Sequence, residues 1–226
     1  MQNSYKRIDA HLSSLGYCTR SEAKKFLRIF ELTVNDKRVF DTSIKAYHND
    51  IKVNNEVLDP EIITILLNKP SGFICSHNDA GSLIYALIPS RWNRRNPKIS
   101  TIGRLDVDTT GAIILTDDGA LNHKLSSPKS DVSKIYEATL AVPLNGDEKE
   151  IFASGELMLN GEKKPLLPAV LEVISETHVR LEICEGKYHQ VKRMFAAVGN
   201  RVLSLHRVSF GGFMVDDLKE GEYKFI

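Results

Sequence analysis

Three side chains that could do chemistry lie close together in the stretch GRLDVDTTGAIILTDDG, namely Asp106, Asp108 and Thr110. One chemistry open to this D-x-D-x-T pattern is the attack of an aspartate on a phosphoryl group. A carboxylate can also act alone, as a covalent nucleophile toward a sugar or a base. The stretch alone is compatible with both chemistries, so the choice between them depends on the neighbouring residues.

A third interpretation of the same stretch is a calcium-binding loop, with Gly111 at its sixth position and Asp117 at its twelfth. Such a loop lies between two helices and ends in a bidentate glutamate, which is longer than aspartate. Here the middle of the loop reads AIILT, and its β-branched residues favour a strand. We therefore exclude calcium.

Phosphoryl transfer would require a buried parallel strand directly before Asp106, within repeated β–α units. The letters of the motif resemble those of haloacid-dehalogenase-type phosphatases. The preceding residues, STIGRL, are only weakly apolar, contain Gly and Arg, and follow a basic loop. This context excludes the phosphatase and favours Asp106 as a lone reactive carboxylate.

The composition is that of an ordinary globular protein. The 226 residues are 42% hydrophobic and 26% charged, with a formal net charge of +1, and could form one domain or two. No apolar run could span a bilayer and the N-terminus lacks a signal peptide, so we expect a cytoplasmic protein without membrane association. Cys18, Cys75 and Cys184 are odd in number and far apart, which excludes a disulfide framework and a clustered zinc site.

The near-zero net charge hides two basic segments. Residues 1–45 carry nine Lys/Arg against five Asp/Glu, and RWNRRNPKISTIGR (91–104) contains five basic residues and no acid. Two such segments, one of them beside Asp106, favour a polyanionic partner such as nucleic acid.

The first residues predict two short helices. Ile8, Leu12 and Leu15 share one helical face, which Gly16 terminates. A capping box, Thr19-Arg20-Ser21-Glu22, precedes the second helix. The buried stripe of this helix consists of Ala23, Phe26, Leu27 and Phe30. Its exposed side carries four cations: Arg20, Lys24, Lys25 and Arg28.

Strands follow the two helices. LTVNDKRVF predicts a hairpin with Asn35-Asp36 at its turn, and IKVNNEVL predicts one further strand. The motifs R-I-D-x-x-L, T-R-S-E-A and V-N-D-K-R-V resemble the S4 domain, a small RNA-binding module, over residues 1–58. ELTVN departs from the family, which usually has glycine before the strand. The resemblance implies that the four exposed cations contact RNA.

Asp59-Pro60 predicts a boundary, so residues 59–226 form a second domain. Strands are indicated by IITILLNKP, AIILT, IYEATLAV and HVRLEICEG. In the third of these, Tyr136, Ala138, Leu140 and Val142 share one face. Strands outnumber helices and do not alternate regularly with them, which predicts an α+β fold.

Four motifs of this second domain occur in register: NKPSGFICS, GRLDVDTTGAIILTDDG, KIYEATL and EGKYHQVKRMFAAVGNRVLSLHRVSFGGF. Together they resemble the RsuA family of pseudouridine synthases, from about residue 62 to the C-terminus. The resemblance implies a mixed, mainly antiparallel sheet with flanking helices. It also implies the isomerisation of a uridine, whose N1–C1′ bond breaks and whose base rejoins the sugar through C5. No atom is gained or lost, so we expect no cofactor and no metal.

The resemblance assigns roles to four residues. Asp106 is the nucleophile, and Tyr136 stacks on the base and assists deprotonation at C5. Leu205 lines the uracil pocket. Arg104 lies next to the nucleophile and helps the target uridine to leave its stack. His123, His189 and His206 do not have the spacing of a metal site and are interpreted as RNA-facing or structural.

A carboxylate in a dry pocket requires a nearby cation to stay ionised, and two candidates follow one another at Lys192 and Arg193. The apolar stripe of the predicted helix over YHQVKRMFAAVG consists of Val191, Met194, Phe195 and Val198. Lys192 lies at the border of this stripe, and Arg193 points outward. The motif alignment also places Lys192 at the cation position of the family. We therefore predict that Lys192 pairs with Asp106 and that Arg193 contacts RNA.

The motifs are most similar to those of the small-subunit members of the family. This implies 16S rRNA as the partner, either free or in a small-subunit assembly intermediate, with uridine 516 as the target and a role in ribosome biogenesis. We expect a monomer. Two alternatives are a pseudouridine synthase acting on 23S rRNA and, from a different class, a non-catalytic RNA-binding protein of S4 type.

Overall fold

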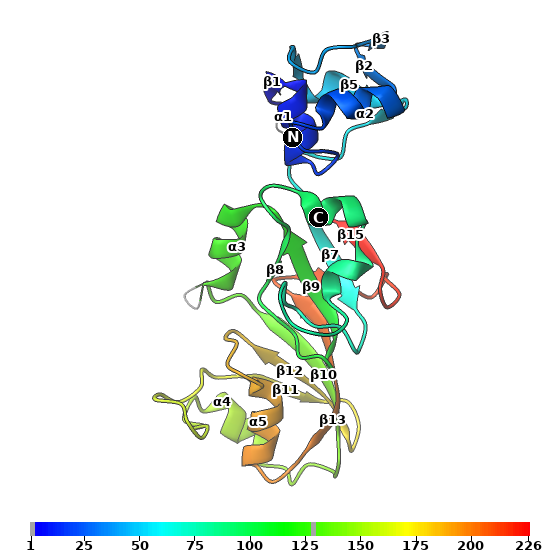
Figure 1. Ribbon diagram of the computed structural model, residues 1–226. Coiled ribbons are helices and arrows are strands. Elements are labelled where there is room, and N and C mark those ends of the chain that lie inside the picture. The colour runs from blue at the N-terminus through cyan, green and yellow to red at the C-terminus, as the bar shows by residue number, and fades with distance from the viewer. Residues whose placement is uncertain (1–2, 128–129) are drawn as a thin grey trace. The chain divides into compact units, whose positions relative to one another are not determined.

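The computed structural model describes residues 3–127 and 130–226 (Figure 1). The chain forms two compact units. The first comprises residues 1–64, 88–100 and 116–119, and the second comprises residues 65–87, 101–115 and 120–226. The N-terminal unit therefore includes two segments that lie far beyond residue 58 in the sequence.

The N-terminal unit contains short helices and hairpins. Its elements are β1 (Tyr5–Arg7), α1 (Ile8–Ser14), α2 (Ala23–Ile29), β2 (Leu32–Val34), β3 (Lys37–Arg38), β4 (Lys45–Tyr47), η1 (His48–Asp50), β5 (Ile51–Val53), β6 (Glu56–Val57) and η3 (Ser90–Arg94). The two predicted helices are confirmed. Gly16 follows α1 with φ +81°, and a Cβ there would lie 2.4 Å from the carbonyl oxygen of Arg91, so only glycine fits.

Two asparagine-containing turns build the hairpins. Asn35 and Asp36 both have positive φ between β2 and β3, which confirms the predicted turn. The prediction of a single strand over IKVNNEVL was wrong. Asn54 and Asn55 also have positive φ, and they separate β5 from the antiparallel β6. Asparagine tolerates the left-handed region better than most residues, and this local chemistry outweighed the β-forming residues on either side.

The surface of α2 agrees in part with the prediction. Its buried residues are Ala23 and Phe26, whereas Phe30 is exposed and lies just beyond the helix end. The backbone N–H of Thr19 donates to the Glu22 carboxylate over 3.0 Å, as in a capping box, but α2 begins only at Ala23, so this bond closes the turn before the helix. The four cations of this region are all exposed: Arg20, Lys24, Lys25 and Arg28.

Part of the basic segment 91–104 is used inside the fold. Arg95 is only 2% exposed, and its Nε donates to Asp117 over 2.7 Å. Arg91 forms a two-point ion pair with Asp59, with both contacts at 2.8 Å. These two arginines therefore form ion pairs within the fold, and the prediction of a polyanionic partner depends on the other basic residues of the segment.

The second unit is built on one mixed sheet. Its elements are β7 (Thr64–Lys69), η2 (Ile84–Leu87), β8 (Ser100–Ile102), β9 (Thr110–Thr116), α3 (Gly119–Ser126), β10 (Lys134–Leu140), α4 (Glu148–Ala153), β11 (Val170–Val173), β12 (His178–Ile183), α5 (Gln190–Ala197), β13 (Val202–Phe210), β14 (Phe213–Met214) and β15 (Tyr223–Phe225). The strand order is β11-β12-β10-β13-β9-β7-β15, with β14 paired to β13 and β8 to β9. The pairing is mainly antiparallel, but β9 and β13 run parallel. The predicted α+β class is confirmed.

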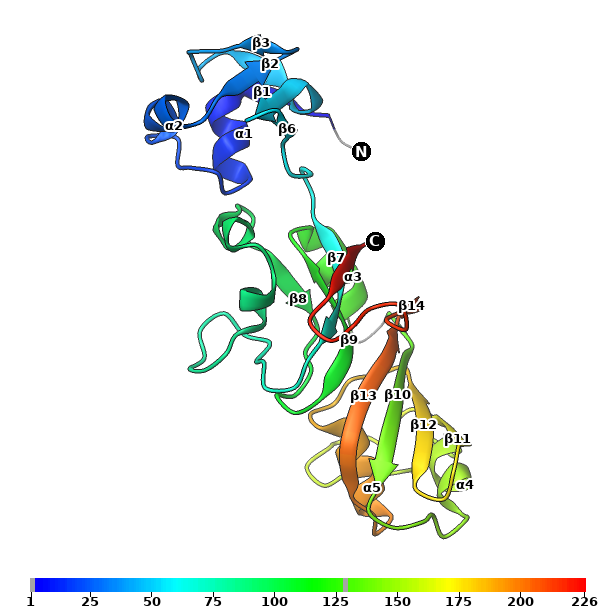
Figure 2. The same ribbon diagram turned by 90° about the vertical axis from the view of Figure 1, so that its right-hand side faces the viewer.

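The long strands β10 and β13 lie side by side, and α4 and α5 cover one face of this part of the sheet (Figures 1 and 2). Tyr136, Ala138 and Leu140 on β10 are buried, as their alternation predicts. Val142 is 52% exposed because the strand ends at Leu140, so its predicted place on the buried face was wrong. Among the described residues, no helix has the length and apolar character needed to cross a membrane.

Candidate active site

Asp106 lies in the loop between β8 and β9, and buried Lys69 holds this loop. Lys69 has no exposed surface, and its Nζ donates to the carbonyl oxygens of Thr109 (2.8 Å), Val107 (3.3 Å) and Pro70 (2.9 Å). Burial lowers the pKa of Lys69. Two of these acceptors, Val107 and Thr109, belong to the loop, so the buried ammonium group holds the turn that presents Asp106. Lys69 lies in the NKP motif, but its role in holding this loop was not predicted from the sequence.

The Asp106 carboxylate faces two side chains from the start of α5. Lys192 Nζ lies 3.0 Å from its Oδ2, and His189 Nε2 lies 3.3 Å from its Oδ1. Lys192 also contacts Asp108 at 2.7 Å. The side chains of Asp106 and Lys192 are 28% and 26% exposed, so the pair is accessible to a ligand. The contact with His189 was not predicted, because the position of His189 depends on a left-handed backbone at the helix start.

The charges at this site perturb each other. Burial on its own lowers the pKa of Lys192, but hydrogen bonds and charge from Asp108 and Asp106 outweigh it, so the net pKa is raised. The hydrogen bond from Lys192 lowers the pKa of Asp108. A lysine that remains protonated favours an ionised carboxylate beside it, which is the form that can act as a nucleophile.

Lys192 and Arg193 follow one another on α5 but have different partners. The predicted contact between Lys192 and Asp106 is present, whereas Arg193 Nη1 pairs with Glu162 at 2.9 Å and also donates to the carbonyl oxygen of Tyr188. The buried face of α5 consists of Val191, Met194 and Phe195. Burial of this face orients the two cations as the helical period predicts. The contact with Glu162 leaves Arg193 less available to RNA than expected.

A glycine allows β13 to approach the nucleophile strand. Gly111 on β9 pairs with Arg207 in parallel register, at φ +105°. A Cβ at Gly111 would lie 2.2 Å from the carbonyl oxygen of Arg207, a separation that real atoms do not adopt. The glycine of the DTTG motif therefore brings Arg207 beside the strand that follows Asp106.

Arg207 and Tyr136 form a buried pair on neighbouring strands. Tyr136 and Arg207 are 8% and 2% exposed, and Arg207 Nη1 donates to the Tyr136 hydroxyl over 3.3 Å. Arg207 Nε donates to the carbonyl oxygen of Ala112 over 2.6 Å, and the guanidinium also lies over the ring of Phe210. Its Nη2 is buried and has no partner among the described residues. No role was predicted for Arg207, although period-2 alternation in β13 places it on the same face as Leu205.

These residues line one cavity of about 590 Å³ within the second unit. Its polar lining includes Arg104, Asp106, Lys134, Tyr136, Lys192 and Arg207. Leu205, which is 8% exposed, contributes apolar surface, and Arg193 is not part of the lining. The volume lies within the usual range of small-ligand pockets. The cavity combines one nucleophilic carboxylate, a surplus of cations and aromatic surface, which suits a nucleotide.

Comparisons with known proteins show which family this chain belongs to. Residues 63–197 match the family model for RNA pseudouridylate synthase. The chain is 49% identical to ribosomal small subunit pseudouridine synthase A of Escherichia coli (strain K12) over 225 residues, which covers 96% of this chain and 95% of the relative. It is 42% identical to the protein of the same name from Pasteurella multocida (strain Pm70), with 96% and 94% covered.

A solved structure, described as a crystal structure of pseudouridylate synthase, superimposes with a TM-score of 0.69 at 40% identity, covering 98% of this chain and 96% of that one. The chain therefore belongs to the RNA pseudouridylate synthase family. It is an isomerase, and its partner is RNA.

Proposed function

We propose that the protein converts one uridine of 16S rRNA, uridine 516, to pseudouridine. The small-subunit relatives that match nearly the whole chain support 16S rRNA as the substrate. The geometry of Asp106 supports the reaction most directly, because its carboxylate contacts Lys192 at 3.0 Å and lines a cavity with Tyr136 and Arg207.

Asp106 acts as the nucleophile in this proposal. Lys192 and His189 hold the carboxylate from two sides, at 3.0 and 3.3 Å. The carboxylate bonds covalently to the sugar or the base, and the N1–C1′ bond breaks. The uracil then turns within the cavity, a new bond forms between C1′ and C5, and the bond to Asp106 breaks, which returns the free carboxylate. Each bond broken is replaced, so the product is an isomer of the substrate.

Tyr136 removes the proton from C5 in the last step, and a proton is returned at N1. The Arg207 guanidinium donates to the Tyr136 hydroxyl over 3.3 Å and so positions the oxygen that accepts this proton. Leu205 excludes water from the face of the base. Arg104 is exposed at the rim, where it can take the place of the flipped uridine in the RNA.

Residues 1–58 act as an S4-like RNA-binding domain in this proposal. The exposed cations on and before α2 lie where phosphate groups can reach them: Arg20, Lys24, Lys25 and Arg28. The protein works as a cytoplasmic monomer during ribosome biogenesis, on free 16S rRNA or on an assembly intermediate of the small subunit.

The test uses C5-tritiated 16S rRNA, supplied free and in partly assembled subunits, together with carbodiimide mapping of the product. Wild-type protein should release tritium and form one pseudouridine at position 516. A transcript with cytidine at this position and an Asp106→Asn enzyme serve as controls, and neither should react. Modification of 23S rRNA instead would support the large-subunit alternative. RNA binding without tritium release from any rRNA would support a non-catalytic S4-type protein.

A further inference from the structure

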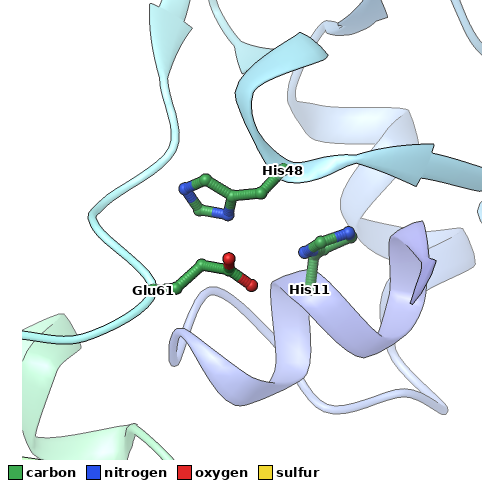
Figure 3. A group of neighbouring side chains, drawn as sticks. All are labelled: His11, His48 and Glu61. Atoms are coloured by element: carbon green, nitrogen blue, oxygen red, sulfur yellow. The ribbon is translucent and has the colours of Figure 1, made fainter. Parts of the chain in front are cut away.

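Two histidines and a glutamate meet in the N-terminal unit. His11 lies on α1, His48 begins η1, and Glu61 lies in the segment before β7 (Figure 3). One ligand atom from each residue lies within 4.8 Å of the others. The two imidazole rings have centroids 5.6 Å apart, and Figure 3 shows the Glu61 carboxylate directed toward them. None of the three residues lines the cavity that contains Asp106.

The hydrogen bond of His11 determines which of its nitrogens has a free lone pair. His11 has no exposed surface, and its Nε2 lies 3.1 Å from the carbonyl oxygen of Ala46. Since a carbonyl can only accept, Nε2 carries the hydrogen, and Nδ1 of the neutral ring is an acceptor. Metal-binding histidines commonly have this arrangement, with the second nitrogen donating to a backbone carbonyl.

Both Nδ1 atoms are buried without a partner among the described residues. His11 Nδ1 and His48 Nδ1 each lack a hydrogen bond, and His48 is only 6% exposed. Buried polar atoms nearly always have a partner, because an unpaired one loses its interactions with water and gains nothing. Two such atoms beside a carboxylate therefore indicate a ligand that accepts electron pairs.

The Glu61 carboxylate is held in place from the other side. The backbone N–H of Ser4 donates to its Oε2 over 3.0 Å, and the Ser4 hydroxyl donates to Oε1. Lys6 Nζ lies 3.4 Å from Oε1, and its side chain is 36% exposed. Lys6 therefore compensates part of the carboxylate charge from the solvent side, while the carboxylate still faces the imidazoles.

Two imidazole nitrogens and one carboxylate oxygen form a donor set typical of zinc and related divalent ions. Metal–ligand bonds of about 2.1 Å place tetrahedral ligand atoms about 3.4 Å apart. The three ligand atoms, within 4.8 Å of one another, would have to move closer together to reach this spacing. We propose that His11, His48 and Glu61 bind a divalent transition-metal ion of the zinc class, which ties the segment before β7 to α1 and η1 and keeps a fourth position for water.

Zinc titration of the full-length, tag-free protein by calorimetry tests this site. We expect one equivalent to bind and to raise the thermal unfolding midpoint. His48→Gln and Glu61→Gln should each weaken binding by about 100-fold, and neither midpoint should then rise with zinc. The matched control His123→Gln changes an exposed histidine on α3 and should bind zinc like the wild type. Lys6→Met should bind more tightly, because a competing positive charge has been removed.

Equal zinc affinity in His48→Gln, Glu61→Gln and His123→Gln would overturn the proposal, as would the absence of binding to wild-type protein at 100-fold excess over chain. If His48→Gln does not fold, as judged by circular dichroism, Glu61→Gln decides alone, since Glu61 lies outside the helices and strands. Weaker or unchanged binding by Lys6→Met would show that Glu61 is not a ligand and would overturn the proposed donor set. Because these readouts do not involve turnover, they are independent of the proposed function.

Discussion

Asp106 and Asp117 belong to one acidic stretch and each pairs with a basic side chain, yet the two pairs differ in their surroundings. The side chains of Asp117 and Arg95 are 3% and 1% exposed, against 28% and 26% for Asp106 and Lys192. Asp117 uses one oxygen for Arg95 and the other for the backbone N–H of Ile63, both at 2.7 Å. Asp106 lines a cavity. A buried, fully bonded carboxylate supports the fold, whereas a partly exposed one with a protonated neighbour can react.

The largest expected effect is on turnover at the exposed pair. Asp106→Asn keeps the size of the side chain but removes the nucleophilic oxygen, so tritium release from C5-labelled rRNA should fall on the order of 10³-fold or more. Its free energy of unfolding should change by less than about 1 kcal/mol, since the site is partly exposed. Turnover within tenfold of wild type, with mass spectrometry showing no reversion to Asp, would contradict the role of Asp106.

The corresponding substitution of Asp117, in the buried pair with Arg95, should lower the free energy of unfolding. Asp117→Asn leaves Arg95 without its counter-charge and replaces one acceptor oxygen by a donor. The expected loss in the free energy of unfolding is about 3–5 kcal/mol, measured by urea denaturation. A loss below about 1 kcal/mol would show that burial of this pair does not decide its function, and the contrast with Asp106 would fail.

Lys192 and Arg193, the neighbouring cations of α5, test whether contact with Asp106 decides which cation catalysis requires. Lys192→Ala should abolish turnover in RNA-saturated assays, whereas Lys192→Arg should retain part of it because the positive charge remains. Arg193→Ala, the matched control on the same helix, should keep turnover within a few-fold, since Arg193 pairs with Glu162. Single-turnover kinetics at saturating RNA separates these effects from binding. Loss of catalysis in Arg193→Ala but not in Lys192→Ala would show that Lys192 is not the cation on which Asp106 depends.

The smallest expected effect concerns the exposed cations of the N-terminal unit. Lys24→Ala/Lys25→Ala should weaken RNA binding and lower the log–log salt slope by about one to two, because each phosphate contact contributes about 0.7–0.9. Lys149→Ala/Lys219→Ala removes two other exposed lysines and is the control. Equal slopes for the two double variants would mean that the face with Lys24 does not contact RNA.

Local sequence determined a large part of this protein. Periodicity predicted both N-terminal helices, the buried strands and the α+β class, since these depend on contacts between near neighbours. The helical period separated Lys192 from Arg193 for the same reason. The prediction of one continuous strand failed at Asn54-Asn55 because it gave too little weight to another local property, the turn preference of asparagine.

Only the tertiary structure decided the partners that come from distant segments. Arg95 belongs to a basic segment of the sequence, and only the packing shows that Asp117 pairs with it inside the fold. Strand pairing brings Arg207 to the Tyr136 hydroxyl, and the ammonium group of Lys69 donates to a backbone carbonyl of the loop that contains Asp106. His11, His48 and Glu61 meet across three segments that no local spacing connects. The identity of a charged residue is local, but its burial and its counter-charge depend on the packing of the whole chain, and these decide whether it stabilises the protein or reacts.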